Sequence, residues 1–252
     1  MNSNGTYQKL TKKDGKSLAY GLLEGQKDLP MIVFLGGYRS DMTGTKASFL
    51  NEFCLKNNYG FLRFDYSGHG ASDGDFRDGC IGDWLNDTLT MINHTTKGDM
   101  ILIGSSMGGW IGLLAAKILG DKVKSFIGIA AAPDFTDWVW QTEMTEVARN
   151  LCKQQGYIET PDGDYFTLKL FEDGAQHLTL DKPLELTCPV TLLHGKLDDV
   201  VPYTLAQKLT EHIKSPAPTK IILIEDGDHR LARAKDLEIL LKIVEKLVLS
   251  SH

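Results

Sequence analysis

The chain is poor in cysteine, and its cysteines are not spaced like metal ligands or a disulfide framework. Four cysteines occur in 252 residues, at positions 54, 80, 152 and 188. Secreted disulfide-rich domains carry many closely spaced cysteines, and zinc sites use paired ones. We therefore expect four reduced thiols rather than disulfides or a zinc site.

Excess positive charge and long apolar runs are also missing. The formal net charge is −6 at pH 7, and the basic residues form no cluster longer than Lys12-Lys13. A nucleic-acid-binding protein needs a basic face, and a membrane-spanning helix needs ~20 consecutive apolar residues. Residues 1–5 are polar and do not resemble the apolar core of a signal peptide. We expect a cytoplasmic protein with no nucleic-acid partner and no transmembrane segment.

Apolar residues are abundant enough for a large core. They make up 42% of the chain, which excludes a disordered protein. Strand-length apolar runs alternate with longer helical stretches, a pattern typical of a mostly parallel sheet flanked by helices. We expect one α/β domain over residues 1–252. The predicted strands are 17–23, 31–35, 60–64, 100–103, 125–130, 190–194 and 220–224, with an antiparallel edge strand at 7–10. The predicted helices are 45–56, 81–93, 107–119, 203–213 and 236–249.

One motif indicates a reactive serine. Gly104, Ser106 and Gly108 form a Gly-x-Ser-x-Gly sequence between the predicted strand 100–103 and the predicted helix 107–119. In an α/β-hydrolase this is the nucleophile elbow, a turn so tight that a Cβ at either glycine would collide with the adjoining strand or helix. Ser106 would lie at a helix N-terminus, where free backbone N–H groups favour negative charge. The motif predicts an α/β-hydrolase fold with Ser106 as nucleophile.

Such a serine needs an acid and a histidine, which follow it in that order along the chain. Among the seven histidines, His229 lies in a short polar loop directly after the last predicted strand, 220–224. The acid is Asp198 or Asp199, from the loop after strand 190–194. The spacing His-Gly-x-x-Asp-x-x-Val-Pro is common among these enzymes and favours Asp198 as the acid that orients His229. Asp199 is then a solvated loop acid.

Two further histidines lie near the expected site. His194 ends a strand rather than lying in a free loop, and we expect a structural role for it. His69 lies in a glycine-rich loop after strand 60–64, and we expect it to pack within that loop.

Two loops are expected to donate backbone hydrogen bonds to an oxyanion. One donor is the N–H of Met107, the residue after the nucleophile. The other comes from the Gly36-Gly37-Tyr38-Arg39-Ser40 loop, where the N–H of Tyr38 is favoured and its side chain is free to pack. Arg39 has two interpretations: it binds a substrate carboxylate, or it braces its own loop, which we favour.

A long segment separates strands 125–130 and 190–194. Its length of about 60 residues exceeds that of an ordinary loop, and it shows no strand pattern. We expect residues 133–186 to form a lid over the nucleophile. Trp138, Trp140 and Phe166 are candidates for lining an acyl or aryl pocket, although each could instead belong to the lid's own small core. Together the aromatic residues favour an apolar acyl group.

Several segments resemble the family of abhydrolase-domain-containing protein ten and its bacterial relatives. They are residues 36–47, 63–68, 104–110, 194–202 and 228–230, and the Gly-Tyr-x-Ser…Gly-Thr-Lys-Ala stretch in the first is the most specific. The resemblance implies a serine thioesterase that removes palmitoyl groups from protein cysteines and also cleaves acyl-glucuronide esters. It also implies Ser106, Asp198 and His229 as the catalytic triad.

The sequence thus predicts a serine hydrolase that cleaves carboxylic esters or acyl thioesters through an acyl-enzyme on Ser106, with no metal or other cofactor. The substrate would be a small-molecule ester or thioester, or an acylated protein. Two alternatives stay open. One is a carbon–carbon bond hydrolase or small serine peptidase that uses the same residues, and the other is a scaffold that binds a ligand without catalysis.

Overall fold

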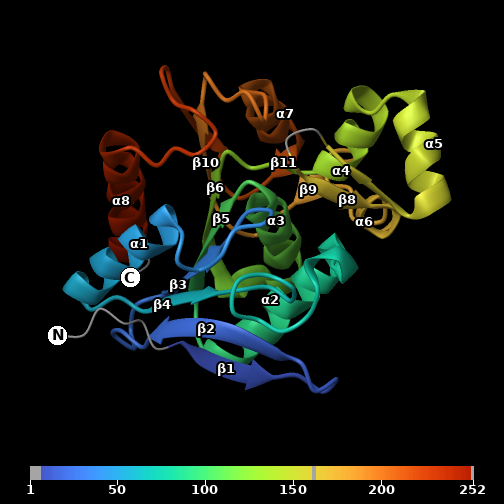
Figure 1. Cartoon of the computed structure of the whole chain (residues 1–252). Helices are drawn as coiled ribbons and strands as arrows, with labels where there is room; N and C mark the ends of the chain where they lie inside the picture. Colours follow the sequence, from blue (N-terminus) through green and yellow to red (C-terminus); the bar gives the residue numbers. More distant parts are fainter. Residues whose placement is uncertain (1–6, 161–162, 251–252) are drawn as a thin grey trace.

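A mixed eight-stranded sheet forms the centre of the molecule (Figure 1). The computed structural model describes residues 7–160 and 163–250. The strand order is β1-β2-β4-β3-β5-β6-β10-β12; the six strands from β4 to β12 are parallel, and β1 and β2 add an antiparallel edge. The strands of this sheet are Gln8–Thr11 (β1), Ser17–Leu23 (β2), Met31–Leu35 (β3), Phe61–Phe64 (β4), Met100–Ser105 (β5), Val123–Ile129 (β6), Val190–Gly195 (β10) and Lys220–Ile224 (β12).

Helices cover both faces of the sheet. In Figure 1, α1 and α8 lie together on one side of the strands, while α2 and α3 lie on the other. The helices outside the segment between β6 and β10 are Thr45–Asn57 (α1), Ile81–Thr95 (α2), Met107–Leu119 (α3), Tyr203–His212 (α7) and Ala234–Leu249 (α8), with short 3₁₀ turns at Phe76–Asp78 and Gly120–Lys122.

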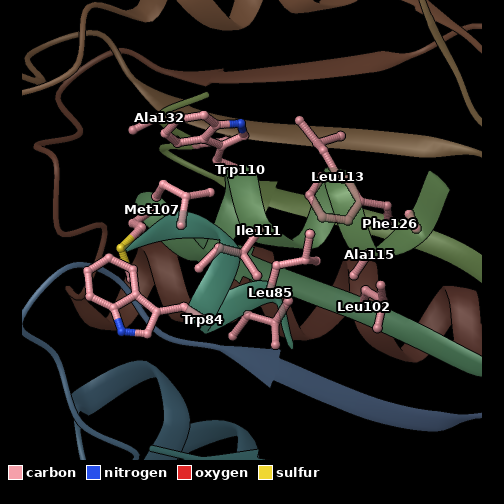
Figure 2. Close-up of a cluster of buried hydrophobic side chains, with 14 of the residues drawn as sticks. Trp84, Leu85, Leu102, Met107, Trp110, Ile111, Leu113, Ala115, Phe126 and Ala132 are labelled. Carbon is pink, nitrogen blue, oxygen red and sulfur yellow. The ribbon is translucent and has the colours of Figure 1, made fainter. Parts of the chain in front are cut away.

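Alternation along the buried strands builds a separate apolar layer on each face. In β3, Ile32 and Phe34 pack with α1 and α8, whereas Val33 and Leu35 pack with α2 and α3. Side chains at alternate strand positions point to opposite faces, so a continuous apolar run is buried on both sides. Figure 2 shows part of the second layer, where Trp84 lies beside the α3 residue Met107.

The predicted α/β-hydrolase fold is confirmed, and the predicted strands and helices outside the long segment are all present. Four of these thirteen elements have the predicted bounds, and the other nine differ by one or two residues at an end. Ile213 was predicted as the last residue of a helix, but it begins the short strand β11, Ile213–Lys214, which pairs with β9, Leu184–Glu185. The four cysteines are free and buried. Within the described residues, no helix is long and apolar enough to span a membrane.

The segment between β6 and β10, residues 133–186, is here called the insertion. The expectation that it contains no strand was wrong, because β7 and β8 form an antiparallel hairpin that pairs Ile158 with Phe166. Strands of three residues are too short to show an alternating pattern. The elements of the insertion are Phe135–Trp138 (α4), a π-helical turn at Val139–Glu143, Glu146–Gln155 (α5), Tyr157–Glu159 (β7), Tyr165–Thr167 (β8), Leu168–Gly174 (α6) and β9.

Candidate active site

The site lies at the carboxyl ends of the parallel strands, where open α/β sheets bind their ligands. Ser106 connects β5 directly to α3 with φ 54° and ψ −120°, a conformation that L-residues rarely adopt. Its N–H donates to Ile129 O at 2.9 Å, and its carbonyl accepts from Ala132 N at 3.1 Å. These bonds to the β6 strand end hold the turn in its strained form.

The two elbow glycines are required by close backbone contacts. A Cβ on Gly104 would lie 2.2 Å from Gly108 O, and a Cβ on Gly108 would lie 2.2 Å from Leu35 O. Both distances are far below contact distance, as the sequence predicted. The elbow therefore fits only because the chain lacks side chains at both positions.

Ser106, His229 and Asp198 are brought together from three separate loops. His229 Nε2 lies 3.2 Å from Ser106 Oγ, and His229 Nδ1 donates to Asp198 Oδ2 at 2.9 Å. A carboxylate only accepts, so the Nδ1 atom carries the proton and Nε2 is left as the acceptor for the serine hydroxyl. Ser106 and His229 are half-buried, whereas the Asp198 side chain has an exposed fraction of 0%.

Both oxygens of the Asp198 carboxylate accept hydrogen bonds. Oδ1 accepts from the N–H groups of Val200 and Val201 at 2.9 and 2.7 Å, and Oδ2 lies 3.0 Å from His194 Nε2. Burial alone would raise the pKa of Asp198, but hydrogen bonds from His194, His229 and Val201 outweigh it and hold the pKa well below its usual range. Asp199 is exposed.

The loop after β3 lies directly against the serine. A Cβ on Gly37, the residue before Tyr38, would be 3.3 Å from Ser106 Cβ and 3.4 Å from Ser105 O. Met107 is the first residue of α3, so its N–H has no acceptor within the helix. The assignment of the Tyr38 and Met107 N–H groups as oxyanion donors stays a prediction.

The Tyr38 side chain packs as an aromatic anchor. Its ring stacks on Phe166 with centroids 5.5 Å apart and meets Phe76 and Phe135 edge to face, at 4.8 and 5.7 Å. The hydroxyl donates to Tyr165 O, and burial raises the pKa of the phenol. Tyr38 thereby ties the loop after β3 to the β7–β8 hairpin of the insertion.

Arg39 braces the same junction. Its guanidinium donates to Gly163 O and lies 3.5 Å from Asp164 Oδ1, at the turn of the hairpin. The side chain is 50% exposed. The structure thus brings Arg39 to the insertion rather than to its own loop, and its role stays a prediction.

The three aromatic candidates of the insertion lie in different surroundings. Trp138 lines a cavity of about 530 Å³ between the start of the insertion and α7. Phe166 packs on Tyr38 and Phe171. Trp140 packs on Phe171 at 4.8 Å, with Lys153 Nζ 5.7 Å from the centre of its ring. Trp138 is thus the one of the three that the structure brings to this cavity, whereas Trp140 lies in the core of the insertion.

The two other histidines are both buried. His69 meets Phe76 and Trp84 edge to face at 5.0 and 5.1 Å, which fits the expected packing role, and burial lowers its pKa. His194 has an exposed fraction of 1%, but its contact with Asp198 was not predicted. The separation of four residues between His194 and Asp198 is the signal that could have indicated it.

Lys46 is a second residue that sequence reasoning missed. It lies in the first turn of α1, and its Nζ donates to the carbonyl of Arg230, next to His229. Burial lowers the pKa of Lys46 to about 8, and the nearby Asp228 opposes that change. Its place in the Gly-Thr-Lys-Ala stretch was the available signal. Within the described part of the chain, no group of three or more His, Cys, Asp or Glu residues could hold a metal ion.

The family follows from comparison with known proteins. A family model described as serine aminopeptidase, S33, matches residues 29–162, more than half of the chain. With the sheet and elbow described above, this match shows that the chain belongs to the α/β-hydrolases, in a family of esterases and thioesterases.

Among its relatives is the palmitoyl-protein thioesterase ABHD10. The rat protein is 34% identical over 245 residues, which cover 95% of this chain and 81% of the relative. The human protein is also 34% identical over 245 residues, covering 95% and 79%. Both relatives are named as mitochondrial, and a cytoplasmic location for this chain stays a prediction.

Solved structures agree with this relationship. Mouse alpha/beta hydrolase domain-containing protein 10 matches with a TM-score of 0.90 at 33% identity, covering 98% of this chain and all 100% of that one. A protein from Agrobacterium vitis matches with a TM-score of 0.91 at 37% identity, covering 96% and 98%. Est1E from Butyrivibrio proteoclasticus, solved with ferulic acid, covers 97% and 98% with a TM-score of 0.80, but at 22% identity it shows the shared fold alone.

Proposed function

We propose that this protein is a serine hydrolase that cleaves acyl thioesters and carboxylic esters through an acyl-enzyme on Ser106. The observation that carries the proposal is the hydrogen-bonded line from Ser106 Oγ through His229 to the buried Asp198, with distances of 3.2 and 2.9 Å. This arrangement of hydroxyl, imidazole and carboxylate is the one that activates a serine.

Each residue has a separate task in the reaction. Ser106 Oγ attacks the acyl carbon while His229 Nε2 takes the hydroxyl proton. His229 then gives that proton to the leaving thiol or alcohol, and Asp198 stabilises the imidazolium formed in between. Water attacks the acyl-enzyme by the same route and releases the acid. No cofactor enters this cycle.

The oxyanion of each tetrahedral intermediate would be held by backbone donors. The N–H of Met107 at the start of α3 and the N–H of Tyr38 are the two proposed groups, because Met107 directly follows Ser106 and Tyr38 follows Gly37, which packs against Ser106. Loss of one such donor typically costs 10²- to 10³-fold in kcat. The α3 N-terminus adds a favourable field at the same point.

The acyl group is proposed to bind under the insertion, which would act as a lid on a single domain. The cavity beside α7 has a volume of about 530 Å³ and is lined in part by Trp138, Leu178, Leu180 and Leu205. That volume lies within the usual range for ligand pockets, ~300–1,000 Å³. Two lining residues are close in sequence to groups of the site: Asp134 follows Ala132, which bonds Ser106 O, and Pro202 follows Val201, which bonds Asp198.

Acylated protein cysteines are the proposed natural substrates, in addition to small acyl thioesters. The support comes from the relatives named palmitoyl-protein thioesterase, which match over 95% of this chain. A thioester in a protein also requires an open path to Ser106, and the half-buried state of Ser106 and His229 is consistent with one.

A series of acyl thioesters with one leaving group and increasing chain length tests this function. Each added CH₂ contributes about 0.8 kcal/mol until the pocket is full, so kcat/KM should rise from acetyl upward and then level off. Trp138→Ala should flatten the rise more than it lowers the acetyl rate. Trp140→Ala is the matched control, because that ring packs on Phe171, and it should keep the wild-type profile. A flat wild-type profile would contradict the apolar acyl pocket.

Peptide hydrolysis is a second candidate, favoured by the description of the matching family model. Asp137 and Asp181 also line the cavity, and carboxylates there could bind the ammonium group of a peptide N-terminus. Aminoacyl anilides assayed with wild type and Ser106→Ala distinguish the candidates. Faster cleavage of these amides than of acyl thioesters would assign the site to a peptidase.

A further inference from the structure

We infer that His194 is a positioning residue that controls the basicity of Asp198 and, through it, the proton affinity of His229. The inference rests on the proposed function, in which Asp198 and His229 serve Ser106. His194 Nε2 lies 3.0 Å from Asp198 Oδ2, the same oxygen that accepts from His229 Nδ1 at 2.9 Å. One carboxylate oxygen is therefore shared between two imidazoles.

The second contact of His194 determines where its proton lies. Nε2 is also 2.9 Å from the carbonyl oxygen of Val201. A carbonyl and a carboxylate both accept, so an unprotonated Nε2 would face two acceptors with no hydrogen between them. Nε2 must therefore carry a proton, which it shares between Asp198 Oδ2 and Val201 O. The position of His194 at the end of β10 fixes this donor within the sheet.

This donor changes what Asp198 can do for His229. With Val200 and Val201 bound to Oδ1 and His229 bound to Oδ2, the carboxylate cannot rotate without losing a hydrogen bond, and His194 Nε2 lies 3.0 Å from Oδ2. Each donor also withdraws negative charge from the carboxylate. His194 thus keeps Asp198 ionised and oriented, while it limits how strongly Asp198 stabilises the imidazolium of His229.

Other charged groups around the pair do not replace this role. Lys46 on α1 donates to the carbonyl of Arg230, and Asp228 Oδ1 accepts from Leu231 N. Lys196 pairs with Glu225 at 2.6 Å, and Asp199 is exposed. These groups remain in every variant proposed below, so their effects on His229 cancel in the comparison.

The test is the titration of His229, followed by ¹⁵N NMR of histidine-labelled protein and assigned by comparison with His229→Gln. His194→Leu removes the donor, and we expect the pKa of His229 to rise, because the negative charge of Asp198 is then shared with one donor fewer. The acid limb of kcat/KM against pH should move upward by the same amount. His194→Gln is the matched control: its amide nitrogen reaches the position of Nε2 and can donate to both acceptors, so it should restore the wild-type pKa.

The outcomes separate this inference from the proposed function. If His194→Leu does not fold, His194→Asn takes its place, since its shorter amide does not reach Oδ2. An unchanged His229 pKa in a folded donor-free variant, or equal pKa values in the Gln and donor-free variants, would overturn the inference. Wild-type protein that hydrolyses no ester or thioester would refute the proposed function, while the NMR titration would still decide the role of His194.

Discussion

Replacement of Gly108 by alanine tests whether the elbow is built as the structure indicates. The added Cβ would lie 2.2 Å from Leu35 O and 2.4 Å from Gly36 O. Both are backbone atoms at the end of β3, which is hydrogen-bonded in the sheet and cannot move aside as a side chain could. The start of α3 must therefore shift by about 1 Å to restore contact distance.

Two opposing effects determine how much Gly108→Ala changes the free energy of unfolding. Alanine gains up to about 1 kcal/mol over glycine within a helix, whereas overpacking against a rigid neighbour costs about 1–3 kcal/mol and occasionally more. We expect a net loss of about 2 kcal/mol, equivalent to a fall in Tm of roughly 4–8 °C for a chain of this size. The shift also moves Ser106 and the N–H of Met107, and a displacement of about 1 Å can cost 10²-fold in rate.

Thermal unfolding and thioester hydrolysis measure the two consequences in one protein preparation. Gly112→Ala is the comparison in the same helix, because its Cβ would meet side chains rather than backbone, the ring edge of Phe126 at 2.6 Å and Leu35 Cδ1 at 3.3 Å. Gly98→Ala is the control for a glycine-to-alanine change without a new contact, since nothing lies within 4 Å of its Cβ. Wild-type stability and activity in Gly108→Ala would refute the close contact between α3 and β3.

Three further predictions concern Asp198 and Arg39. Asp198→Asn should lower kcat by about 10⁴-fold, whereas Asp199→Asn should change it by less than about tenfold; the reverse ranking would assign the acid role to Asp199. The pKa of Asp198 is lowered in the folded protein, so its contribution to stability is present above about pH 4 and is lost as pH falls further. Urea unfolding at pH 6, 4 and 3 should therefore show the stability difference between wild type and Asp198→Asn shrinking with acid, and a constant difference would contradict the lowered pKa. Arg39→Ala should cost less than about 1 kcal/mol and spare neutral esters, because this pair is half exposed; a selective loss on carboxylate-bearing esters would instead make Arg39 a substrate ligand.

The centre of the sheet was predictable because β3, β5, β6 and β10 are buried on both faces and appear as continuous apolar runs. Ser106 and its neighbours were predictable for a related reason: the elbow needs glycine at fixed positions, and the strand before it and the helix after it have clear patterns. The placement of His229 followed from topology alone, because a loop after a parallel strand opens at the same sheet edge as the elbow.

Contacts made by irregular backbone could not be predicted. The separation of four residues was the one signal for the contact between His194 and Asp198, but the loop that brings Val201 O back to the same nitrogen follows a path that no periodic pattern encodes. Trp138 and Trp140 were likewise indistinguishable in the sequence. The π-helical turn at Val139–Glu143, closed by Met144 N bonding to Val139 O at 3.0 Å, places their rings in different surroundings.

The most direct test of the central claim is to find which side chain reacts with a fluorophosphonate. An activated serine attacks this probe rapidly, whereas an ordinary surface hydroxyl does not. Peptide mass spectrometry of the folded, labelled protein should place one adduct on Ser106, and Ser106→Ala should remain unlabelled with its fold intact. An adduct on Ser105, or no adduct on folded wild-type protein, would contradict the assignment of Ser106 as the nucleophile.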